Sequence, residues 1–455
     1  MSELRKLFGT DGIRGVAGEY PLDTKTIFAT GVALGRLLGA ANKPLQLLLG
    51  ADTRESSAWI AAVIAEGLQS GGATVANAGV ITTPGVAYLT RKHGFAAGVV
   101  ISASHNPWRD NGIKIFGSDG YKLPDEFELA IEAEIFRQLE ITPPVGGPFL
   151  APAADPRFVI EYEEYLWKLF PALDLTGLRL VVDCANGAAS GIAPDLFSRL
   201  GARVDVTHAA PNGRNINAHC GALHPEIVAA ETLKRGADLG ITFDGDADRA
   251  LFADANGKVV NGDGVLLLAA RDLRSRGKLN QEKVVATTMS NMGLEAALRG
   301  DGVSMLRAPV GDKYVLEWMK EHRASLGGEQ SGHILFPALS TTGDGLLTAL
   351  VVLDIVRRSR KLLHELTADL KVFPQVIVNV KVREKRPLEE FVTITDTIRA
   401  AEEELKDNGR VVVRYSGTEP LARVMIEAES QSRMQFHAER IAGAIREELG
   451  AVLPV

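Results

Sequence analysis

Short apolar segments alternate along the chain with longer segments in which apolar residues recur at helical spacing. Four of the short segments are rich in Val, Ile and Leu and have the length of buried strands: Gln46–Gly50, Ala97–Ser102, Leu178–Asp183 and Leu239–Asp244. Between them, Ser57–Ser70 and Ala188–Leu200 carry apolar residues with the period of a helix. This alternation predicts βαβ units on parallel or mixed sheets that are covered on both faces.

Near the C-terminus the regular alternation of strand-like and helical segments ends. After Phe373-Pro374, strand-like segments and one helical segment follow in the order Val376–Val382, Pro387–Leu405, Arg410–Val413 and Ala422–Ala428. A small α+β domain fits this order. A Pro/Gly-rich stretch at 142–156 has the composition of a linker and closes the first part of the chain.

We therefore predict an α/β protein with three mixed-sheet α/β domains and a C-terminal α+β domain. The boundaries that we expect are 1–154, 155–255, 256–372 and 373–455. A chain of 455 residues is long enough for several domains of ordinary size.

Composition narrows the classes of function. The formal net charge of −7 argues against nucleic acid as a partner, because binding to a phosphate backbone needs a basic surface. Two cysteines, Cys184 and Cys220, form no disulfide framework and have no metal-ligand spacing, so we expect them to be buried or incidental. The N-terminus has no signal-peptide pattern and no segment is apolar enough to span a membrane, so we expect a cytoplasmic protein.

An unusual polar loop follows each of the four predicted strands, where α/β proteins gather their ligand-binding groups. The loop after Phe243 holds Asp244, Asp246 and Asp248, separated by small residues. Such closely spaced carboxylates repel one another unless a cation neutralises them, which makes a merely solvated acidic turn the weaker interpretation. The loop lacks the Gly and Glu of an EF-hand, and its oxygen ligands suit Mg²⁺ that shares its shell with water or a phosphate.

The loop Ser102-Ala-Ser-His-Asn-Pro107 offers a hydroxyl near this acidic loop. Ser, Asn and Pro are also ordinary turn residues, so a Ser–His pair alone is weak support for catalysis. Lys114 follows at a distance that can reach the same loop. A serine beside Mg²⁺ and cationic groups is a plausible phosphoryl acceptor.

Two further loops carry polar groups on Gly-rich backbone. The segment Gly327–His333 presents donors and acceptors suited to a polyhydroxylated ligand, although a Gly-rich hairpin turn explains it equally well. The segment Arg414–Pro420, with Arg423 beyond it, has the arginines and hydroxyls of an anion cradle. Arg14 and Arg54 also lie on loops of this kind.

Taken together and in this order, the segments GTDGIRG, SASHNP with DNGIK, DGDADR, GGEQSGH and RYSGTEP resemble the motifs of the α-D-phosphohexomutase superfamily. The resemblance extends from Gly9 to about Ala428. It implies four domains around a central cleft, an isomerase activity and one Mg²⁺ per chain. It also implies a sugar 1,6-bisphosphate as intermediate and activator.

The resemblance further assigns roles to individual residues. Ser104 would carry the phosphoryl group, and Asp244, Asp246 and Asp248 would bind Mg²⁺ together with an oxygen of phospho-Ser104. The residues beside the reacting phosphate would be His105, Lys114 and Arg249, with Lys114 a candidate for general acid–base catalysis. The substrate-binding residues would be Arg14, Glu329, Gln330, Ser331, His333, Arg414, Ser416, Gly417, Thr418 and Arg423.

The substrate that we expect is a hexosamine phosphate, glucosamine 6-phosphate, acted on by a monomer or homodimer. The segments GEQSGH, Arg307–Asp312 and Asn215–Asn217 favour this branch. Relatives acting on mannose or glucose phosphates typically have Met in place of Gln330 and His near Asp312. A phosphomannomutase or phosphoglucomutase with the same mechanism is the alternative. Two other classes stay open: a phosphatase with Asp244 as nucleophile, which leaves Ser104 without a role, and a non-catalytic sugar-phosphate sensor.

Overall fold

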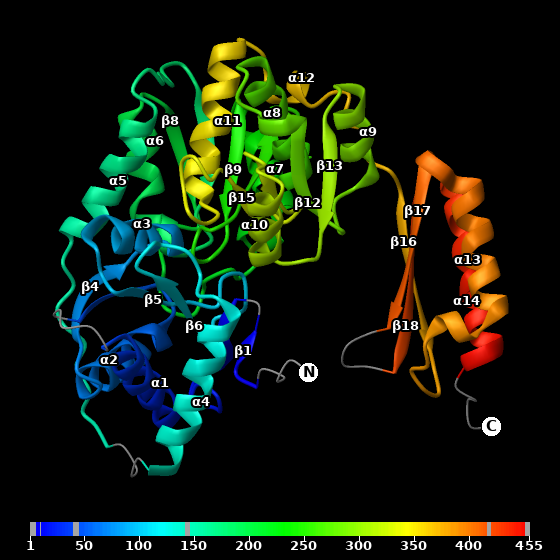
Figure 1. Cartoon of the computed structure of the whole chain (residues 1–455). Helices are drawn as coiled ribbons and strands as arrows, with labels where there is room; N and C mark the ends of the chain where they lie inside the picture. The colour runs from blue at the N-terminus through cyan, green and yellow to red at the C-terminus, as the bar shows by residue number, and fades with distance from the viewer. Residues whose placement is uncertain (1–5, 10, 40–44, 142–145, 416–419, 451–455) are drawn as a thin grey trace. The chain divides into compact units, whose positions relative to one another are not determined.

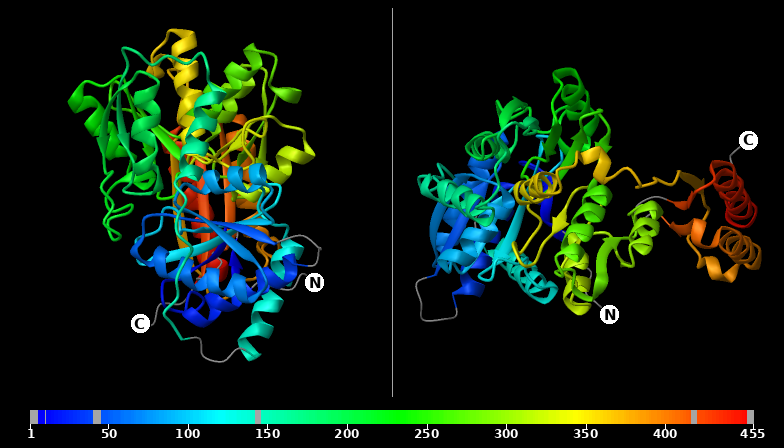
Figure 2. Two further views of the ribbon diagram at one scale, coloured as in Figure 1. Left: turned by 90° about the vertical axis from the view of Figure 1, so that its left-hand side faces the viewer. Right: turned by 90° about the horizontal axis from the view of Figure 1, so that it is seen from above.

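The structure is a computed structural model, and it describes residues 6–9, 11–39, 45–141, 146–415 and 420–450. These residues form four β-sheets, each with its own helices (Figures 1 and 2). The chain divides into two compact units: Met1–Met289 with Val303–Ala368, and Ser290–Gly302 with Asp369–Val455. The first unit holds three mixed sheets and the second holds a small antiparallel sheet. The predicted class, three α/β domains followed by an α+β domain, is confirmed.

The first sheet has six strands, in the spatial order β1 (Phe8–Gly9), β2 (Gly12–Val16), β6 (Asp110–Gly117), β5 (Ala97–Ile101), β3 (Gln46–Ala51) and β4 (Thr74–Val80). Its helices are α1 (Thr24–Leu38), α2 (Glu55–Ser70), α3 (Thr83–His93) and α4 (Asp125–Ile141). Helices α1 and α2 lie on one face of the sheet and α3 on the other (Figure 1). Both predicted strands of this region are confirmed, and apolar side chains of both form a core with those of α1, α2 and α4.

The second sheet has the order β11 (Val259–Val260), β10 (Ala250–Asp254), β9 (Leu239–Phe243), β7 (Arg179–Asp183) and β8 (Arg203–Thr207). Strands β7, β8 and β9 are parallel, whereas β10 and β11 are antiparallel to their neighbours. Helices α6 (Ala193–Arg199) and α7 (Pro225–Arg235) pack against this sheet, whereas α5 (Arg157–Leu169) contacts α3 and β4 of the first sheet. Parallel strands end at one edge of the sheet, so the loops after Asp183, Thr207 and Phe243 lie together.

The third sheet has the order β13 (Ser304–Ala308), β12 (Lys283–Thr287), β14 (Gly327–Gly328) and β15 (Ile334–Leu335). Its region of the chain also contains α8 (Gly262–Ser275), α9 (Met292–Gly300), α10 (Asp312–Glu321), α11 (Gly345–Ser359) and α12 (Leu363–Leu366). Asn261 begins α8, because its side chain accepts hydrogen bonds from two backbone N–H groups of the first turn. Helix α9 belongs to the second compact unit, although it lies in sequence between β12 and β13.

The fourth sheet is antiparallel, with the order β16 (Gln375–Lys381), β18 (Leu421–Ala428) and β17 (Gly409–Tyr415). Helices α13 (Val392–Leu405) and α14 (Gln431–Leu449) pack on one face of it and bury an apolar core. All three predicted strands are confirmed within one or two residues of the expected bounds.

Two predicted helices are interrupted. The segment Ala188–Leu200 forms a short 3₁₀ helix (Ala188–Gly191) and then α6, with a break at Ile192 before Pro194. The segment Pro387–Leu405 forms a 3₁₀ turn and then α13, because Phe391 is extended. In the first case proline begins a new helix more readily than it continues one.

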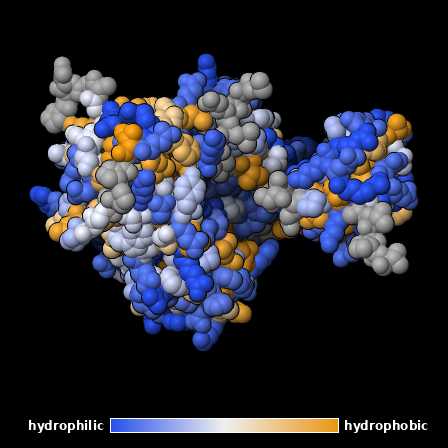
Figure 3. All heavy atoms as spheres, turned by 90° about the horizontal axis from the view of Figure 1, so that it is seen from below, coloured by the Kyte–Doolittle hydropathy of each residue, from blue (hydrophilic) through white to orange (hydrophobic). Residues whose placement is uncertain are grey.

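Within the described residues, no helix is both long enough and apolar enough to cross a membrane. The face drawn in Figure 3 is a mixture of polar and apolar residues without a continuous apolar band.

Candidate functional site

Ser104 lies in the turn that follows β5 and has a left-handed backbone conformation, with φ of 52°. This conformation is costly for a residue with a side chain and persists where the surroundings fix it. The Ser104 backbone N–H donates to the hydroxyl of Ser102 at 2.9 Å. The Ser104 side chain is buried, and its Oγ donates a 2.5 Å hydrogen bond to Oδ2 of Asp244.

Two side chains from different elements hold the backbone on both sides of this turn. Nη2 of Arg54 donates to the carbonyl oxygens of Ser104 and Asn106, at 3.1 and 2.6 Å. Nδ2 of Asn217 donates to the same two oxygens, at 2.9 and 3.1 Å. Arg54 is buried and paired with Asp52. It is therefore not an open anion-binding arginine, as its Gly-rich surroundings in sequence suggested, but a support for the Ser104 turn.

The three aspartates of the loop after β9 converge as the sequence predicts. Asp244, Asp246 and Asp248 are all buried, and one oxygen of each lies within 4.8 Å of the others. Burial and the two neighbouring carboxylates raise the pKa of Asp244. Oδ1 of Asp246 and Oδ1 of Asp248 are buried and have no hydrogen-bond partner among the described residues. Buried carboxylate oxygens without partners are costly, and a hard cation held by oxygen ligands would satisfy them.

Lys114, on β6, extends into the same group of carboxylates. Its Nζ lies 2.7 Å from Asp246, 3.0 Å from Asp11 and 3.2 Å from Asp248. Burial alone would lower the pKa of Lys114, but these three carboxylates raise it well above its ordinary value. The amine is therefore held charged and offsets part of the negative charge of the triad.

A polar cavity of about 400 Å³ opens beside this group. Its lining includes Arg14, His105, Asp248, Arg249, Glu329 and His333, which come from all three sheets of the first unit. These six predicted residues thus line one space that is large enough for a sugar phosphate.

Charged groups of the cavity wall are paired with one another, in part through Lys122, which the sequence did not single out. His333 lies 3.6 Å from Asp248 and 3.4 Å from Asp312. Although burial lowers the pKa of His333, these two carboxylates raise it to about 9. Nζ of Lys122 donates to Asp11 at 2.5 Å and to Asp312 at 2.6 Å, which joins the first and third sheets across this wall.

His105 and Arg249 contact Ser104 and Asp244, respectively. Nδ1 of His105 lies 3.3 Å from Oγ of Ser104. Burial, with Arg249 and Arg14 nearby, lowers the pKa of His105 to about 4, so the imidazole is neutral at physiological pH. The backbone N–H of Arg249 donates to Asp244, and its side chain lines the cavity.

The segment Gly327–His333 is the turn of a hairpin, with β14 paired to β15. The hairpin interpretation is therefore confirmed, and the turn also presents Glu329 and His333 to the cavity. Gln330 and Ser331 do not line that cavity. The Gln330 amide donates to Asp263, and the Ser331 hydroxyl donates to Glu329.

The predicted anion cradle lies in the second unit. Arg414 of β17 and Arg423 of β18 are directly opposed in the antiparallel register and therefore share a face of the sheet. Two arginines on one face present donors from which a single anion can accept hydrogen bonds. The other three predicted members, Ser416, Gly417 and Thr418, lie outside the described residues.

Four residues of the site were missed or given no role from the sequence: Asp11, Lys122, Asn217 and Asp312. Asp11 lies inside the GTDGIRG motif and Asp312 ends a segment used only to judge the substrate. Asn217 lies in another segment used only to judge the substrate. Neither Lys122 nor Asn217 has a local signal for its contacts, because their partners are more than 100 positions away.

Four stretches of the chain match the four domains of one family. They are described as phosphoglucomutase/phosphomannomutase alpha/beta/alpha domains I, II and III and the C-terminal domain, at residues 5–142, 161–257, 261–373 and 377–444. The chain belongs to this family of phosphohexomutases, which are isomerases.

Two proteins with high sequence identity to this chain are both phosphoglucosamine mutases. A phosphoglucosamine mutase of Koribacter versatilis is 60% identical over 454 residues, covering 98% of each chain. A phosphoglucosamine mutase of Solibacter usitatus is 53% identical, covering 98% of this chain and 99% of that one.

Solved structures share the fold. A phosphoglucomutase/phosphomannomutase family protein of Burkholderia thailandensis has a TM-score of 0.78 at 23% identity, covering 97% of this chain and 99% of that one. Aspergillus fumigatus N-acetylphosphoglucosamine mutase, in complex with GlcNAc-6P and magnesium, has a TM-score of 0.62 at 20% identity, with 97% and 96% covered.

Proposed function

We propose that the chain interconverts glucosamine 6-phosphate and glucosamine 1-phosphate through phospho-Ser104 and a glucosamine 1,6-bisphosphate intermediate. The observation that carries the proposal is the Ser104 hydroxyl, which lies in hydrogen-bond contact with a buried carboxylate triad beside a polar cavity. The substrate follows from relatives that are up to 60% identical and are named phosphoglucosamine mutases.

The donor set fits one Mg²⁺ ion. Asp244, Asp246 and Asp248 would hold it through one oxygen each, together with an oxygen of phospho-Ser104. All of these ligands are oxygens, as Mg²⁺ prefers, and two of the carboxylate oxygens accept no hydrogen bond within the described part of the chain. When bound, the ion neutralises charge that develops on the phosphoryl group.

In the first half of the reaction the P–O bond to Ser104 breaks and a P–O bond to the free sugar hydroxyl forms. In the second half the other phosphoryl group moves to Ser104, so the serine ends phosphorylated again. The hydroxyl that attacks phosphorus, on the sugar in the first half and on Ser104 in the second, loses a proton, and this proton has to reach the leaving oxygen.

One residue is placed for the proton transfer and another for electrostatic stabilisation of the phosphoryl group. His105 is neutral and close to Oγ of Ser104, so it can accept the proton and return it. Lys114 is held charged by its carboxylate partners, so we assign it the part of an electrostatic partner of the phosphoryl group and not that of a base.

The remaining predicted residues bind the sugar and its second phosphate. Glu329 and His333 face the cavity and would bind sugar hydroxyls, with Arg14 and Arg249 beside the reacting phosphate. Gln330 and Ser331 would support the turn. The distal phosphate would be bound by Arg414, Ser416, Gly417, Thr418 and Arg423.

The remaining proposals concern the cellular location, the oligomeric state and the pathway of the enzyme. We propose a cytoplasmic enzyme, monomeric or homodimeric, that supplies glucosamine 1-phosphate for UDP-N-acetylglucosamine and peptidoglycan synthesis and binds no nucleic acid. Within the chain, we propose domain boundaries at 154, 255 and 372.

The test is ³¹P NMR of the purified chain with Mg²⁺, a trace of sugar 1,6-bisphosphate and glucosamine 6-phosphate. Parallel samples contain glucose 6-phosphate and mannose 6-phosphate. We expect a 1-phosphate signal that grows fastest from glucosamine. Faster conversion of glucose or mannose would retain the mechanism and replace the substrate, whereas free inorganic phosphate alone would favour the phosphatase.

A variant separates the classes further. Ser104→Ala removes the phosphoryl acceptor, so turnover is lost while Mg²⁺ and sugar phosphate still bind. A phosphatase with Asp244 as nucleophile would keep its activity in this variant.

A further inference from the structure

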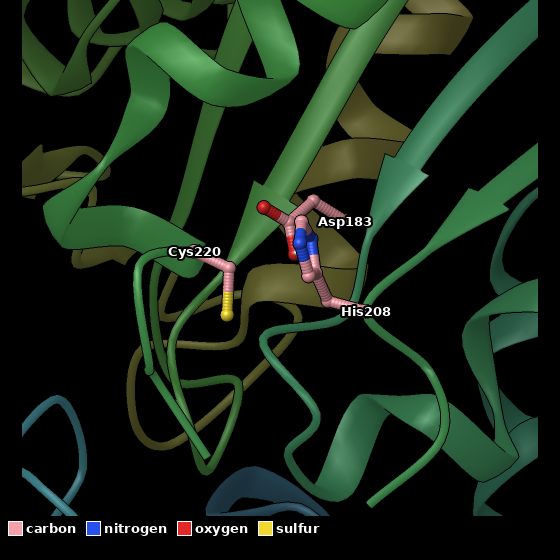
Figure 4. Close-up of side chains that lie close together, drawn as sticks. All are labelled: Asp183, His208 and Cys220. Carbon is pink, nitrogen blue, oxygen red and sulfur yellow. Dashed lines mark ion pairs between the residues drawn. The ribbon is translucent and has the colours of Figure 1, made fainter. Parts of the chain in front are cut away.

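Three side chains with different donor atoms converge at the edge of the second sheet where β7 and β8 end. Asp183 is the last residue of β7, His208 directly follows β8, and Cys220 directly precedes the 3₁₀ turn Gly221–Leu223 (Figure 4). The parallel pairing of β7 with β8 brings the first two together. One donor atom of each of the three residues lies within 4.8 Å of the others.

The environment of these three residues is suited to an ion. Asp183 and Cys220 are fully buried, whereas the side chain of His208 is 32% exposed and leaves a path from solvent. Nδ1 of His208 lies 3.1 Å from Oδ1 of Asp183. This nitrogen is nevertheless buried without a hydrogen-bond partner in the part of the chain that the structure describes. Two ligands about 2.0–2.1 Å from a tetrahedral zinc ion lie about 3.3 Å apart, close to the observed spacing.

We propose that Asp183, His208 and Cys220 form a second metal site, distinct from the aspartate triad, that binds a thiophilic divalent ion such as Zn²⁺. A carboxylate oxygen, an imidazole nitrogen and a thiolate sulfur are ligands of Zn²⁺, whereas Mg²⁺ prefers oxygen ligands alone. Water would occupy the fourth position.

Charge also favours the assignment. A divalent ion with one carboxylate, one thiolate and one neutral imidazole forms a group without net charge, which lowers the cost of its burial. Ion binding transfers the thiol proton of Cys220 to solvent and involves no change of oxidation state. Burial, with Asp183 nearby, raises the pKa of this thiol to about 12, so the ion has to displace the proton.

The ion would also fix loops that reach the reaction site. The oxygens of Asp183 accept hydrogen bonds from the backbone N–H groups of Ala185 and Gly221, at 2.9 and 3.0 Å. The carbonyl of Ala185 in turn accepts from the backbone N–H of Asn217, whose side chain holds the Ser104 turn. The second site is therefore connected by hydrogen bonds to the phosphoryl acceptor.

The experiment is a Co²⁺ titration of the full-length chain after removal of metal, in the presence of excess Mg²⁺. We expect a sulfur-to-cobalt charge-transfer band that saturates at one equivalent and is lost on addition of one equivalent of Zn²⁺. Oxygen-ligated cobalt in the aspartate triad gives no such band, so the readout is independent of the mutase reaction.

The chain offers a matched control, because it contains two cysteines. Cys220→Ser should abolish the band, and Cys184→Ser, which removes the other buried thiol, should retain it. His208→Asn keeps a residue that tolerates the left-handed φ of 46° and should lose the band even if Cys220→Ser fails to fold. Absence of the band in the unchanged chain, its survival in Cys220→Ser, or its removal by Mg²⁺ would each overturn the proposal. Absence of the band would indicate instead that the cluster is a structural His208–Asp183 pair, and its survival in Cys220→Ser would indicate a different sulfur ligand.

Discussion

The Asn217 side chain connects the second sheet to the turn that carries Ser104, and its removal should slow catalysis more than it affects substrate binding. Asn217→Gly removes the amide donor while allowing the observed φ of 57°. The carbonyls of Ser104 and Asn106 each keep a hydrogen bond from Arg54, so neither is left without a partner. Each lost hydrogen bond then costs about 0.5–1.5 kcal/mol, or about 1–3 kcal/mol for the pair.

Part of this free energy holds Ser104 in its left-handed conformation, so we expect kcat to fall. A loss of about 1.4 kcal/mol at the transition state corresponds to about tenfold in rate. KM should change little, because Asn217 is not among the residues that line the cavity. The assay is the steady-state rate with glucosamine 6-phosphate at saturating Mg²⁺, together with the thermal unfolding midpoint.

Two further variants make the prediction specific. Asn217→Ala loses the same donor and adds the strain of a left-handed alanine, about 1–2 kcal/mol, so its unfolding midpoint should be lower than that of Asn217→Gly at a similar kcat. His219→Gly changes a nearby exposed residue that also has a positive φ and should retain the full rate. Wild-type kcat in Asn217→Gly, or an equal loss in His219→Gly, would refute the positioning role.

Three other perturbations test separate parts of the structure. Asp246→Asn weakens one ligand of the triad, so the Mg²⁺ concentration for half-maximal activity should rise by about tenfold or more, which is 1.4 kcal/mol in binding. Asp344→Asn removes a buried carboxyl group. Burial raises the pKa of Asp344 to about 6, about two units above its ordinary value. Ionised Asp344 therefore destabilises the folded state by about 3 kcal/mol, a cost that asparagine does not have. The folded state prefers the protonated form of Asp344, so the stability gained by Asp344→Asn should be largest at pH 7 and shrink as pH falls from 6 to 4. Gly262→Ala places a methyl group 2.0 Å from the carbonyl oxygen of Glu329, and the displaced turn should lower kcat/KM by about tenfold to a hundredfold.

Each of these three has its own check. Isothermal titration with Mg²⁺ that gives equal affinity for Asp246→Asn would remove Asp246 from the ligand set. Unfolding midpoints of Asp344→Asn that run parallel to those of the unchanged chain from pH 7 to 4 would contradict the raised pKa. For Gly262→Ala the control is Gly443→Ala, in the middle of α14, where no atom lies within 4 Å of the added methyl. This control should leave kcat/KM unchanged and raise stability by about 0.4–1 kcal/mol.

The order of the secondary structure was predictable because buried parallel strands are uninterrupted apolar runs. β3, β5, β7 and β9 each appear where the pattern places them, followed by a polar loop. The interruptions at Ile192 and Phe391 were not predictable, because helical periodicity continues through both breaks and the break depends on backbone angles at one residue.

Some residues of the site could be predicted from the sequence and others could not. Ser104 and the three aspartates stand on short loops directly after strands, so their approach follows from local position and strand order. Lys122 and Asn217 depend on tertiary contacts between sheets, which periodicity does not encode. The sequence also did not show that Arg54 forms a buried ion pair with Asp52. The sequence pattern of an arginine on a Gly-rich loop is the same whether the side chain faces solvent or the protein interior.

Helix α9 has a consequence for recombination between relatives. The backbone N–H of Met292 donates to Glu427, the amide of Asn291 donates to the carbonyl of Phe373, and Arg410 donates to the carbonyl of Ser290. The C-terminal sheet therefore depends on a segment that the chain contributes some 70 residues before that sheet begins. A chimera that exchanges only the C-terminal segment would join α9 of one parent to the sheet of the other. The exchangeable module is residues 290–302 together with 369–455.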